Sequence, residues 1–253
     1  MRLPRLRLAL ALAPFLLTGG AEAETWRARA FRFGEERAVK IVVLKAEVLV
    51  GSIDSGGVET ADPDWTATAH ARLVAQIEAQ QRAFGNDIVF LPDQTGDKAK
   101  LIAEYSALFG AVWNAATAQE IERGALPPRR PGVRWTLGSG AARIGEIGGG
   151  DYALIVQSYD AFATGGRKVF SVLRGKVADV LLEGASIHRS YAALVDLTTG
   201  DLVWLNADLH AGGDPRTDDG AAKRVRQLFA DFPRNERPRR STPRWSPPER
   251  MRR

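Results

Sequence analysis

Two histidines and two aspartates in the C-terminal half of the chain are the residues whose types could bind a metal ion. Asp208 and His210 are two residues apart on a predicted strand, so their side chains are expected to point to one face. His188 and Asp214 would join them if residues 190–209 fold back as a hairpin. Two imidazoles and two carboxylates form a donor set that zinc or another divalent cation accepts. The spacing matches no metal-binding motif, however, so these four residues are weak candidates and no metal site is predicted.

The sequence contains no pattern of nucleophilic or cofactor chemistry. It has no cysteine, and no serine lies in a G-x-S-x-G turn. Ser190 and His188 share a face of one predicted strand, which is a weaker relation than a catalytic triad requires. Residues 138–140 (GSG) begin like a dinucleotide-binding fingerprint, but Arg143 occupies the third glycine position. We therefore predict no catalytic residue, no cofactor and no enzymatic activity.

A basic amphipathic segment, residues 167–183, is the third stretch whose residues could carry a function. Its apolar stripe includes Phe170 and Leu173, and its cations are Arg167, Lys168, Arg174 and Lys176. The stripe could pack on the sheet, contact a partner or a second copy, or lie on an anionic membrane surface. Because most such stripes belong to a core, the first interpretation is favoured.

A predicted hairpin, residues 190–209, must position the histidines and aspartates. The runs AALV and LVWL are apolar on successive residues, which is typical of strands covered on both faces. Residues 197–200 (LTTG) connect the two strands, and Gly200 can take the left-handed conformation that the turn needs. We therefore expect two inner strands of a sheet.

The remaining elements predict an α/β sandwich with a mixed sheet in a single domain. Residues 39–50, 87–91 and 151–159 read as strands, and residues 51–61 as a loop. Helices are predicted over residues 64–84 after an Asp62 cap, from an Asp97 cap onward, over residues 140–147, and over residues 217–232. Helices alternating with strands in this way favour one layer of sheet covered by helices.

The two ends of the chain differ from the domain between them. Residues 1–23 combine three arginines, an apolar run and an A-E-A site, so they are predicted to be a signal peptide that is cleaved after Ala23. Residues 24–38 are expected to be an extended lead-in and residues 39–233 the domain. Residues 234–253, with eight Arg and four Pro, are expected to be a disordered tail.

The charge distribution argues against nucleic-acid binding. Residues 1–23 account for +2 of the net charge of +5 and residues 234–253 for +6, which leaves −3 on residues 24–233. A nucleic-acid-binding domain carries its basic patch on the fold itself. The absence of cysteine also excludes a lipid-bearing cysteine and disulfides. These features together predict an unlipidated periplasmic protein.

Five stretches of the sequence resemble a family of exported alphaproteobacterial proteins of unknown function. They are PDWTATAHARL, WTLGSGAA, GGDYALIVQSYDAFATGGR, AALVDLTTGDLVWLN and GGDPRTDDGAAKRV. The arrangement is more distantly similar to the α/β domain shared by the TolB amino-terminal region and the curli-secretion channel protein. The resemblance implies a fold and an envelope location, and it brings no catalytic residues.

Three functions remain open from the sequence. The favoured one is a non-catalytic periplasmic binding or scaffold module that contacts envelope proteins or a second copy of itself. The alternatives are a peripheral protein on an anionic membrane surface, which would use the basic segments, and a metal-dependent enzyme of unknown substrate.

Overall fold

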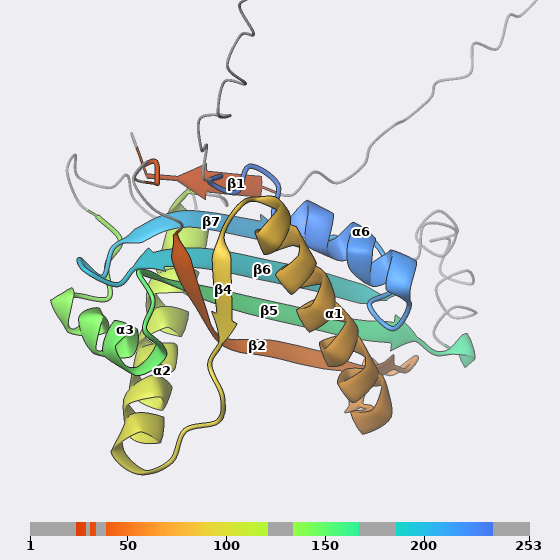
Figure 1. Cartoon of the computed structure of the whole chain (residues 1–253). Helices are drawn as coiled ribbons and strands as arrows, with labels where there is room; N and C mark the ends of the chain where they lie inside the picture. The colour runs from red at the N-terminus through yellow and green to blue at the C-terminus, as the bar shows by residue number, and fades with distance from the viewer. Residues whose placement is uncertain (1–23, 29–30, 34–38, 121–133, 167–185, 235–253) are drawn as a thin grey trace, which may run out of the picture.

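The computed structural model describes residues 24–28, 31–33, 39–120, 134–166 and 186–234, whose arrangement is shown in Figure 1. These residues contain one seven-stranded sheet in the order β1-β7-β6-β5-β2-β3, with β4 also paired to β2. The strands are β1 (Glu24–Arg27), β2 (Lys40–Ile53), β3 (Glu59–Ala61), β4 (Asp87–Phe90), β5 (Tyr152–Ala163), β6 (Ile187–Asp196) and β7 (Leu202–Asp208). The helices are α1 (Pro63–Ala83), α2 (Gly96–Glu120), the 3-10 helix η1 (Ser139–Ala141), α3 (Ala142–Gly148) and α6 (Asp218–Leu228).

The predicted α/β class is confirmed as a mixed sheet with helices packed on both of its faces in one domain. β2 runs parallel to β4 and β5, whereas β5, β6, β7 and β1 follow one another antiparallel. On one face the core contains Leu73 and Ile77 of α1 together with Val225 and Leu228 of α6. On the other face the core contains side chains of α2 and α3, such as Trp113. Figure 1 shows α1 crossing in front of the sheet and α2 passing behind it.

The predicted hairpin is confirmed as β6 and β7. Ser190 pairs with Asp208 and Leu194 with Trp204, and all seven residues of β7 are buried. The connection passes through Gly200, whose φ of 77° is the left-handed conformation expected for it. β6 lies between β5 and β7, and β7 lies between β6 and β1. Both strands are therefore inner strands, as the apolar runs indicate.

Local signals place the helices as predicted. The side chain of Asp62 accepts a hydrogen bond from the Trp65 N–H at 3.0 Å, and Pro63 occupies the first helical turn of α1. Thr217 caps α6 by accepting from the Gly220 N–H at 3.1 Å. Asp97 differs from the prediction, because α2 begins at Gly96 and so places Asp97 within its first turn. An acidic side chain there still suits the positive end of the helix dipole.

The prediction of a loop over residues 51–61 is wrong. β2 continues to Ile53, and β3 returns antiparallel to it over Glu59–Ala61. The turn forms because the Asp54 carboxylate accepts from two backbone N–H groups, of Gly56 at 2.8 Å and of Val58 at 2.9 Å. Gly51 permits the close pairing, since a Cβ at that position would lie 2.2 Å from the Thr60 carbonyl oxygen. The glycines therefore shape a hairpin here.

The N-terminal stretch also contributes more than a lead-in. Glu24–Arg27 forms β1 and pairs with residues 204–207 of β7, so it covers one edge of the sheet. Phe33 is buried among the aromatic side chains of the α1 face. Three predicted features lie outside the described residues: the signal peptide, residues 1–23, the amphipathic segment 167–183, and the tail 234–253 apart from Arg234.

Candidate functional site

A fully buried arginine of α6 lies at the centre of a cluster of buried polar side chains. Arg224 donates from Nη1 to one carboxylate oxygen of Asp160 at 3.0 Å and from Nη2 to the other at 2.8 Å. Nη1 also donates to the hydroxyls of Ser158 at 3.1 Å and Ser190 at 3.0 Å. We call Ser158, Asp160, His188, Ser190 and Arg224 the polar cluster. It joins α6 to β5 and β6 beneath the helix.

The remaining donors of Arg224 hold the loop that follows β7. Nε donates to the Gly212 carbonyl at 3.0 Å, and Nη2 donates to the Gly213 carbonyl at 2.7 Å. A third carbonyl, that of Ala211, lies 3.3 Å from Nη2. Because each nitrogen of the guanidinium group is engaged inside the protein, Arg224 has a structural role and is not presented to a ligand.

His188 completes the polar cluster on the other side of Asp160. Its Nδ1 lies 2.6 Å from Oδ1 of Asp160, and its ring packs edge-on against Phe162. Burial raises the pKa of Asp160, but the hydrogen bonds from His188 and Arg224 outweigh it and hold that pKa below its usual value. Neither serine hydroxyl is bonded to His188; Ser158 and Ser190 instead contact each other at 3.3 Å. The cluster thus contains the residue types of a triad without a presented nucleophile.

The four predicted metal candidates are not brought together. β7 ends at Asp208, so His210 lies exposed in the following turn while Asp208 is buried. The expectation that these two side chains share a face is therefore wrong. Asp208 accepts from the His210 N–H at 3.1 Å, and Asp214 forms a salt bridge with Arg216 at 2.8 Å. Among the described residues no group of three or more His, Asp or Glu side chains is placed to hold a metal ion.

Asp214 and Arg216 form a second contact that ties this loop to α1. The guanidinium of Arg216 lies over the rings of Trp65 at 4.3 Å and Phe162 at 3.8 Å. Burial raises the pKa of Asp214, but its hydrogen bonds with Arg216 outweigh that effect and lower the pKa overall. Asp214 and Arg216 thus belong to the turn that leads into the Thr217 cap of α6, and the guanidinium of Arg216 lies over both aromatic rings.

Asp208 makes a testable contribution to the pH dependence of stability. Its burial raises its pKa above the usual value, and Oδ2 has no hydrogen-bond partner among the described residues. Burying the ionised carboxylate destabilises the folded state. This destabilisation is absent at pH values below the unfolded-state pKa of about 3.9 and is fully present above the raised folded-state pKa. Asp208→Asn should therefore raise the melting temperature at pH 7, by about 2–4 °C for each kcal/mol gained. The gain should shrink as the pH falls toward 4.

Thermal unfolding of the wild type and of Asp208→Asn between pH 4 and pH 7 checks this expectation. Asp93→Asn, at an exposed position, is the control and should change little at any pH. A difference between Asp208→Asn and the wild type that does not vary with pH would contradict the assignment.

The outer edge of β2 is a separate feature that sequence reasoning missed. β4 pairs with Lys40–Val43 and β3 with Gly51–Ile53, but no strand of the described residues pairs with residues 44–49 on that side. Val50 faces this edge, because its N–H and its C=O bond the Thr66 hydroxyl at 3.0 and 3.1 Å. By the two-residue period of a strand, the backbone groups of Val48 and Ala46 face the same way. Among the described residues, this stretch of β2 therefore has no strand partner between β4 and β3, and Ala46 within it is buried in the core of the α1 face.

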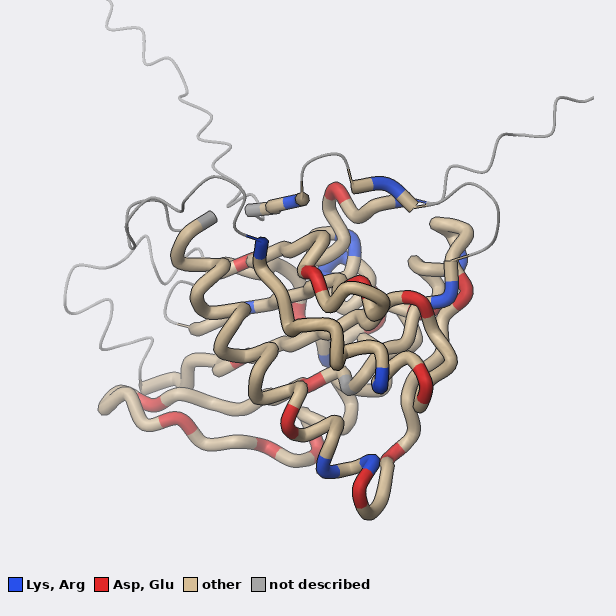
Figure 2. Tube along the Cα trace, turned by 90° about the vertical axis from the view of Figure 1, so that its left-hand side faces the viewer, with Lys and Arg blue, Asp and Glu red and all other residues tan. Residues whose placement is uncertain are grey.

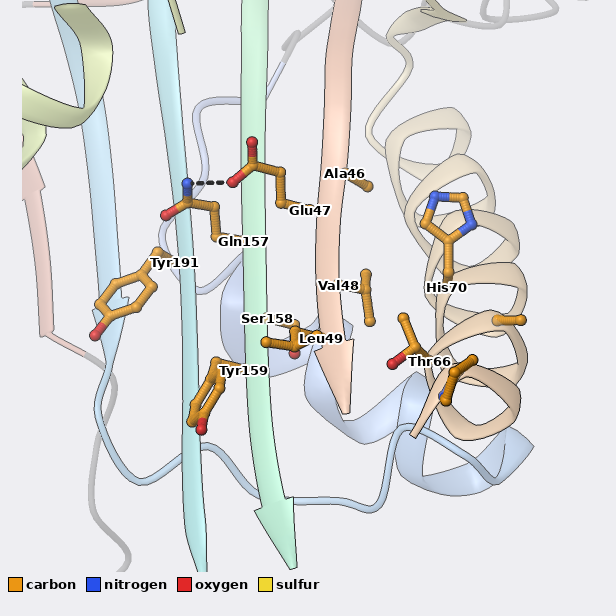
Figure 3. A pocket seen from close by; sticks show the side chains of 12 residues that line it. Ala46, Glu47, Val48, Leu49, Thr66, His70, Gln157, Ser158, Tyr159 and Tyr191 are labelled. Atoms are coloured by element: carbon orange, nitrogen blue, oxygen red, sulfur yellow. Dashed lines mark hydrogen bonds between the residues drawn. The ribbon is translucent and has the colours of Figure 1, made fainter. Parts of the chain in front are cut away.

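A cavity of about 860 Å³ lies around this open edge, and we call it the edge groove. Its lining includes Glu47 and Leu49 of β2, Tyr159 of β5, Tyr191 of β6 and His70 of α1. Figure 3 shows Gln157 and Tyr159 of β5 one after the other, with Tyr191 of β6 beside them and Thr66 and His70 of α1 on the far side of β2. Leu49 is 44% exposed, which is unusual for a leucine in a long strand of a sheet. The groove therefore combines main-chain groups with apolar and aromatic surface.

Two carboxylates, of Glu47 and Glu59, accept hydrogen bonds from polar side chains that line the edge groove. Gln157 donates to the Glu47 carboxylate at 2.8 Å, and the Tyr159 hydroxyl donates to Glu59. Burial and the Glu59 carboxylate raise the pKa of Tyr159 to about 12, while Arg189 nearby lowers it slightly, so the phenol stays neutral. Residues 44–72, which include the unpaired stretch of β2, contain five Asp and Glu, one Lys and one Arg, a net charge of −3. This part of the molecule therefore favours a cationic ligand.

Elsewhere the charges are mixed. Residues 24–234 contain 25 Lys and Arg and 27 Asp and Glu, a net charge of −2. Figure 2 shows both signs interspersed along the described part of the trace. In the part of the chain that the structure describes, no helix has the length and apolarity needed to cross a membrane. The six predicted contact residues of the amphipathic segment, from Arg167 to Lys176, lie outside the described residues.

A signal for the buried arginine was present in the sequence. On α6 the buried positions are Gly220, Ala221, Arg224, Val225 and Leu228, so Arg224 lies within the apolar stripe. A lone cation at such a position needs a buried anion. Sequence alone does not say which of the chain's acidic residues supplies it, because Asp160 lies 64 positions away.

Comparisons with known proteins show limited similarity. No protein-family model and no curated protein matches the chain, so the resemblance to exported alphaproteobacterial proteins and to the TolB-type domain gains no support from them. Among solved structures, a point variant of the PelC dodecamer from Paraburkholderia phytofirmans is 13% identical, with a TM-score of 0.34, over 82% of this chain and 95% of that one. The PelC dodecamer from the same organism in another crystal form is 12% identical, with a TM-score of 0.33, over 81% and 96%.

A third structure, lipoprotein GNA1162 from Neisseria meningitidis, is 16% identical, with a TM-score of 0.27, over 67% of this chain and 80% of that one. All three scores are too low to carry an assembly, a location or a partner from those proteins to this one. The features that the structure itself shows are a mixed α/β domain, a buried polar cluster, and a stretch of β2 with no strand partner among the described residues.

Proposed function

We propose that this protein is an exported, non-catalytic binding module of the cell envelope, and that it binds an extended, basic segment of a protein partner in the edge groove. The observation that carries the proposal is the open stretch of β2 between its pairings with β4 and β3. An extended segment that lies along residues 44–49 would add main-chain hydrogen bonds to the sheet, which is a common mode of peptide recognition.

Side-chain chemistry supports the same occupant. Leu49 and the two tyrosines offer apolar and aromatic surface, and Glu47 offers a carboxylate at the same edge. None of the twelve lining residues that the structure describes is Lys or Arg, and Lys45 is a cation of the same stretch of β2 in the sequence. A segment with basic side chains on one face and apolar side chains on the other would match this arrangement.

The absence of catalysis is part of the proposal and rests on the polar cluster. A catalytic acid, base or nucleophile must be presented to substrate, whereas Asp160 and Arg224 are buried and bonded to one another. The serines of the cluster bond Arg224 and each other, so neither is aligned with an imidazole. The periplasmic location rests on the signal-peptide pattern of residues 1–23.

Photocrosslinking in intact cells tests the proposed function. A photoreactive phenylalanine analogue at Leu49 should give one defined adduct with a protein partner. The same analogue at Leu108 on α2 is the matched control, because Leu108 is 43% exposed, compared with 44% for Leu49. An adduct from position 49 alone supports a binding site at the edge groove, and its mass tells whether the partner is another protein or a second copy. No adduct from position 49, or equal adducts from both positions, would contradict the proposal.

A further inference from the structure

The C-terminal segment, residues 235–253, is complementary in charge to the edge groove. It contains seven Arg and two Glu, a net charge of +5, whereas residues 24–234 carry −2. The acidic stretch of residues 44–72 includes Glu47 and Glu59, both of which lie at the groove. Arg189 lies near Tyr159, so the side of the groove next to Glu47 is the one that favours cations. Attraction between these parts holds within about 10 Å at 0.1 M salt.

The chain is long enough for this segment to reach the groove of its own molecule. The guanidinium of Arg234 lies 5.0 Å from the centre of the Phe84 ring, which fixes the start of the segment at the C-terminal end of α1. Thr66, on the same helix, lines the groove 18 residues earlier, a distance of about 27 Å along the helix axis. The 19 residues from 235 to 253 can span about 59 Å in an extended proline-rich conformation.

The composition of the segment matches the lining in two further ways. Four prolines favour an extended conformation that docks on aromatic side chains, and Tyr159 and Tyr191 line the groove. Residues 239–242 contain no proline, so they can donate N–H groups to the open edge of β2. Arginine already stacks on aromatic rings elsewhere in this chain, as Arg216 does on Trp65 and Phe162.

We infer that residues 235–253 occupy the edge groove of their own molecule and compete there with the partner segment. The inference rests on the proposed function, since it assigns a second occupant to the same site. The apparent affinity for a partner is then the intrinsic affinity of the groove multiplied by the fraction of molecules in which the C-terminal segment is not bound. The C-terminal segment is thereby a built-in regulator of the binding site.

Disulfide trapping in the full chain tests the inference, and the natural absence of cysteine gives a clean background. Leu49→Cys with Ser246→Cys should form an intramolecular disulfide at least tenfold faster than Leu108→Cys with Ser246→Cys, because docking raises the effective concentration of the two thiols. The matched exposure of positions 49 and 108 makes the pair a control for general accessibility. Raising the salt to 1 M should slow the 49–246 pair and leave the control pair unchanged.

A charge variant provides a second readout. Glu47→Gln with Glu59→Gln keeps hydrogen-bond acceptors for Gln157 and Tyr159 but removes both charges, and it should slow closure of the 49–246 pair several-fold. Equal rates for the two cysteine pairs would overturn the inference, and so would covalent dimers as the main product. If the rates are equal and the photoreactive group at position 49 still captures a partner in cells, the inference fails and the proposed function stands. If closure is fast but no partner is captured, the groove binds the segment of its own chain and the proposed function fails.

Discussion

Arg224→Ala should lower the free energy of unfolding by about 3–5 kcal/mol, which is a large share of the stability of a domain of this size. The arginine is fully buried, and its loss leaves the carboxylate of Asp160 in the core with only the His188 ring and the Ser158 hydroxyl as side-chain partners. It also frees the carbonyls of Ala211, Gly212 and Gly213, which the guanidinium holds in place. The variant therefore leaves a charge and several acceptors unpaired in the protein interior.

Denaturant unfolding of Arg224→Ala beside two reference variants checks this expectation. Arg226→Ala removes an exposed arginine two residues further along α6 and should change stability by less than about 0.5 kcal/mol. Arg224→Lys keeps the positive charge but loses the two-pronged contact with Asp160, so it should recover only part of the loss. A cost for Arg224→Ala no larger than that of Arg226→Ala would show that the polar cluster does not hold the fold together.

Trp204→Ala should cost a similar amount, about 3–5 kcal/mol, for a different reason. The indole is fully buried at the centre of the α1 face, where it stacks on Phe229 at 6.1 Å and meets Phe232 edge-on at 4.9 Å. Truncation leaves a cavity that these neighbours cannot fill without moving. The loss should appear as a lower denaturation midpoint with an unchanged slope against denaturant.

Trp204→Phe separates the contribution of aromatic packing to stability from that of the buried indole N–H. The indole N–H is buried and has no hydrogen-bond partner among the described residues, so phenylalanine removes an unpaired donor while it keeps an aromatic ring. The cost should therefore stay below about 1.5 kcal/mol. A loss from Trp204→Phe as large as that from Trp204→Ala would contradict the packing explanation.

The sequence predicted the elements whose signals are local. The AALV and LVWL runs indicated two buried strands, and Gly200 indicated the turn between them, because burial on both faces and positive φ are properties of single positions. The Asp62 cap was likewise readable, since its side chain bonds the backbone N–H of Trp65, three residues later. Those expectations are confirmed.

The features that sequence reasoning missed depend on contacts between distant residues. Arg224 and Asp160 are paired across 64 positions, and neither lies in a motif. The open edge of β2 exists because two separate segments, β4 and β3, cover only its two ends. The error at Asp208 and His210 arose because the strand was assumed to continue, whereas β7 ends at Asp208. Strand ends and strand partners are set by tertiary packing, which a single sequence does not contain.

The central claim is that the outer edge of β2 accepts another extended segment, and amide hydrogen exchange on the complex captured at position 49 tests it most directly. By the period of the strand, the N–H groups of Ala46 and Val48 face that edge, whereas the ladders between β5 and β6 are already formed. Exchange at Ala46 and Val48 should slow at least tenfold in the complex, the factor that corresponds to about 1.4 kcal/mol. Exchange at Ile155 and Ala193 should stay unchanged. Unaltered exchange at Ala46 and Val48 in a complex that is fully formed would contradict strand addition at this edge.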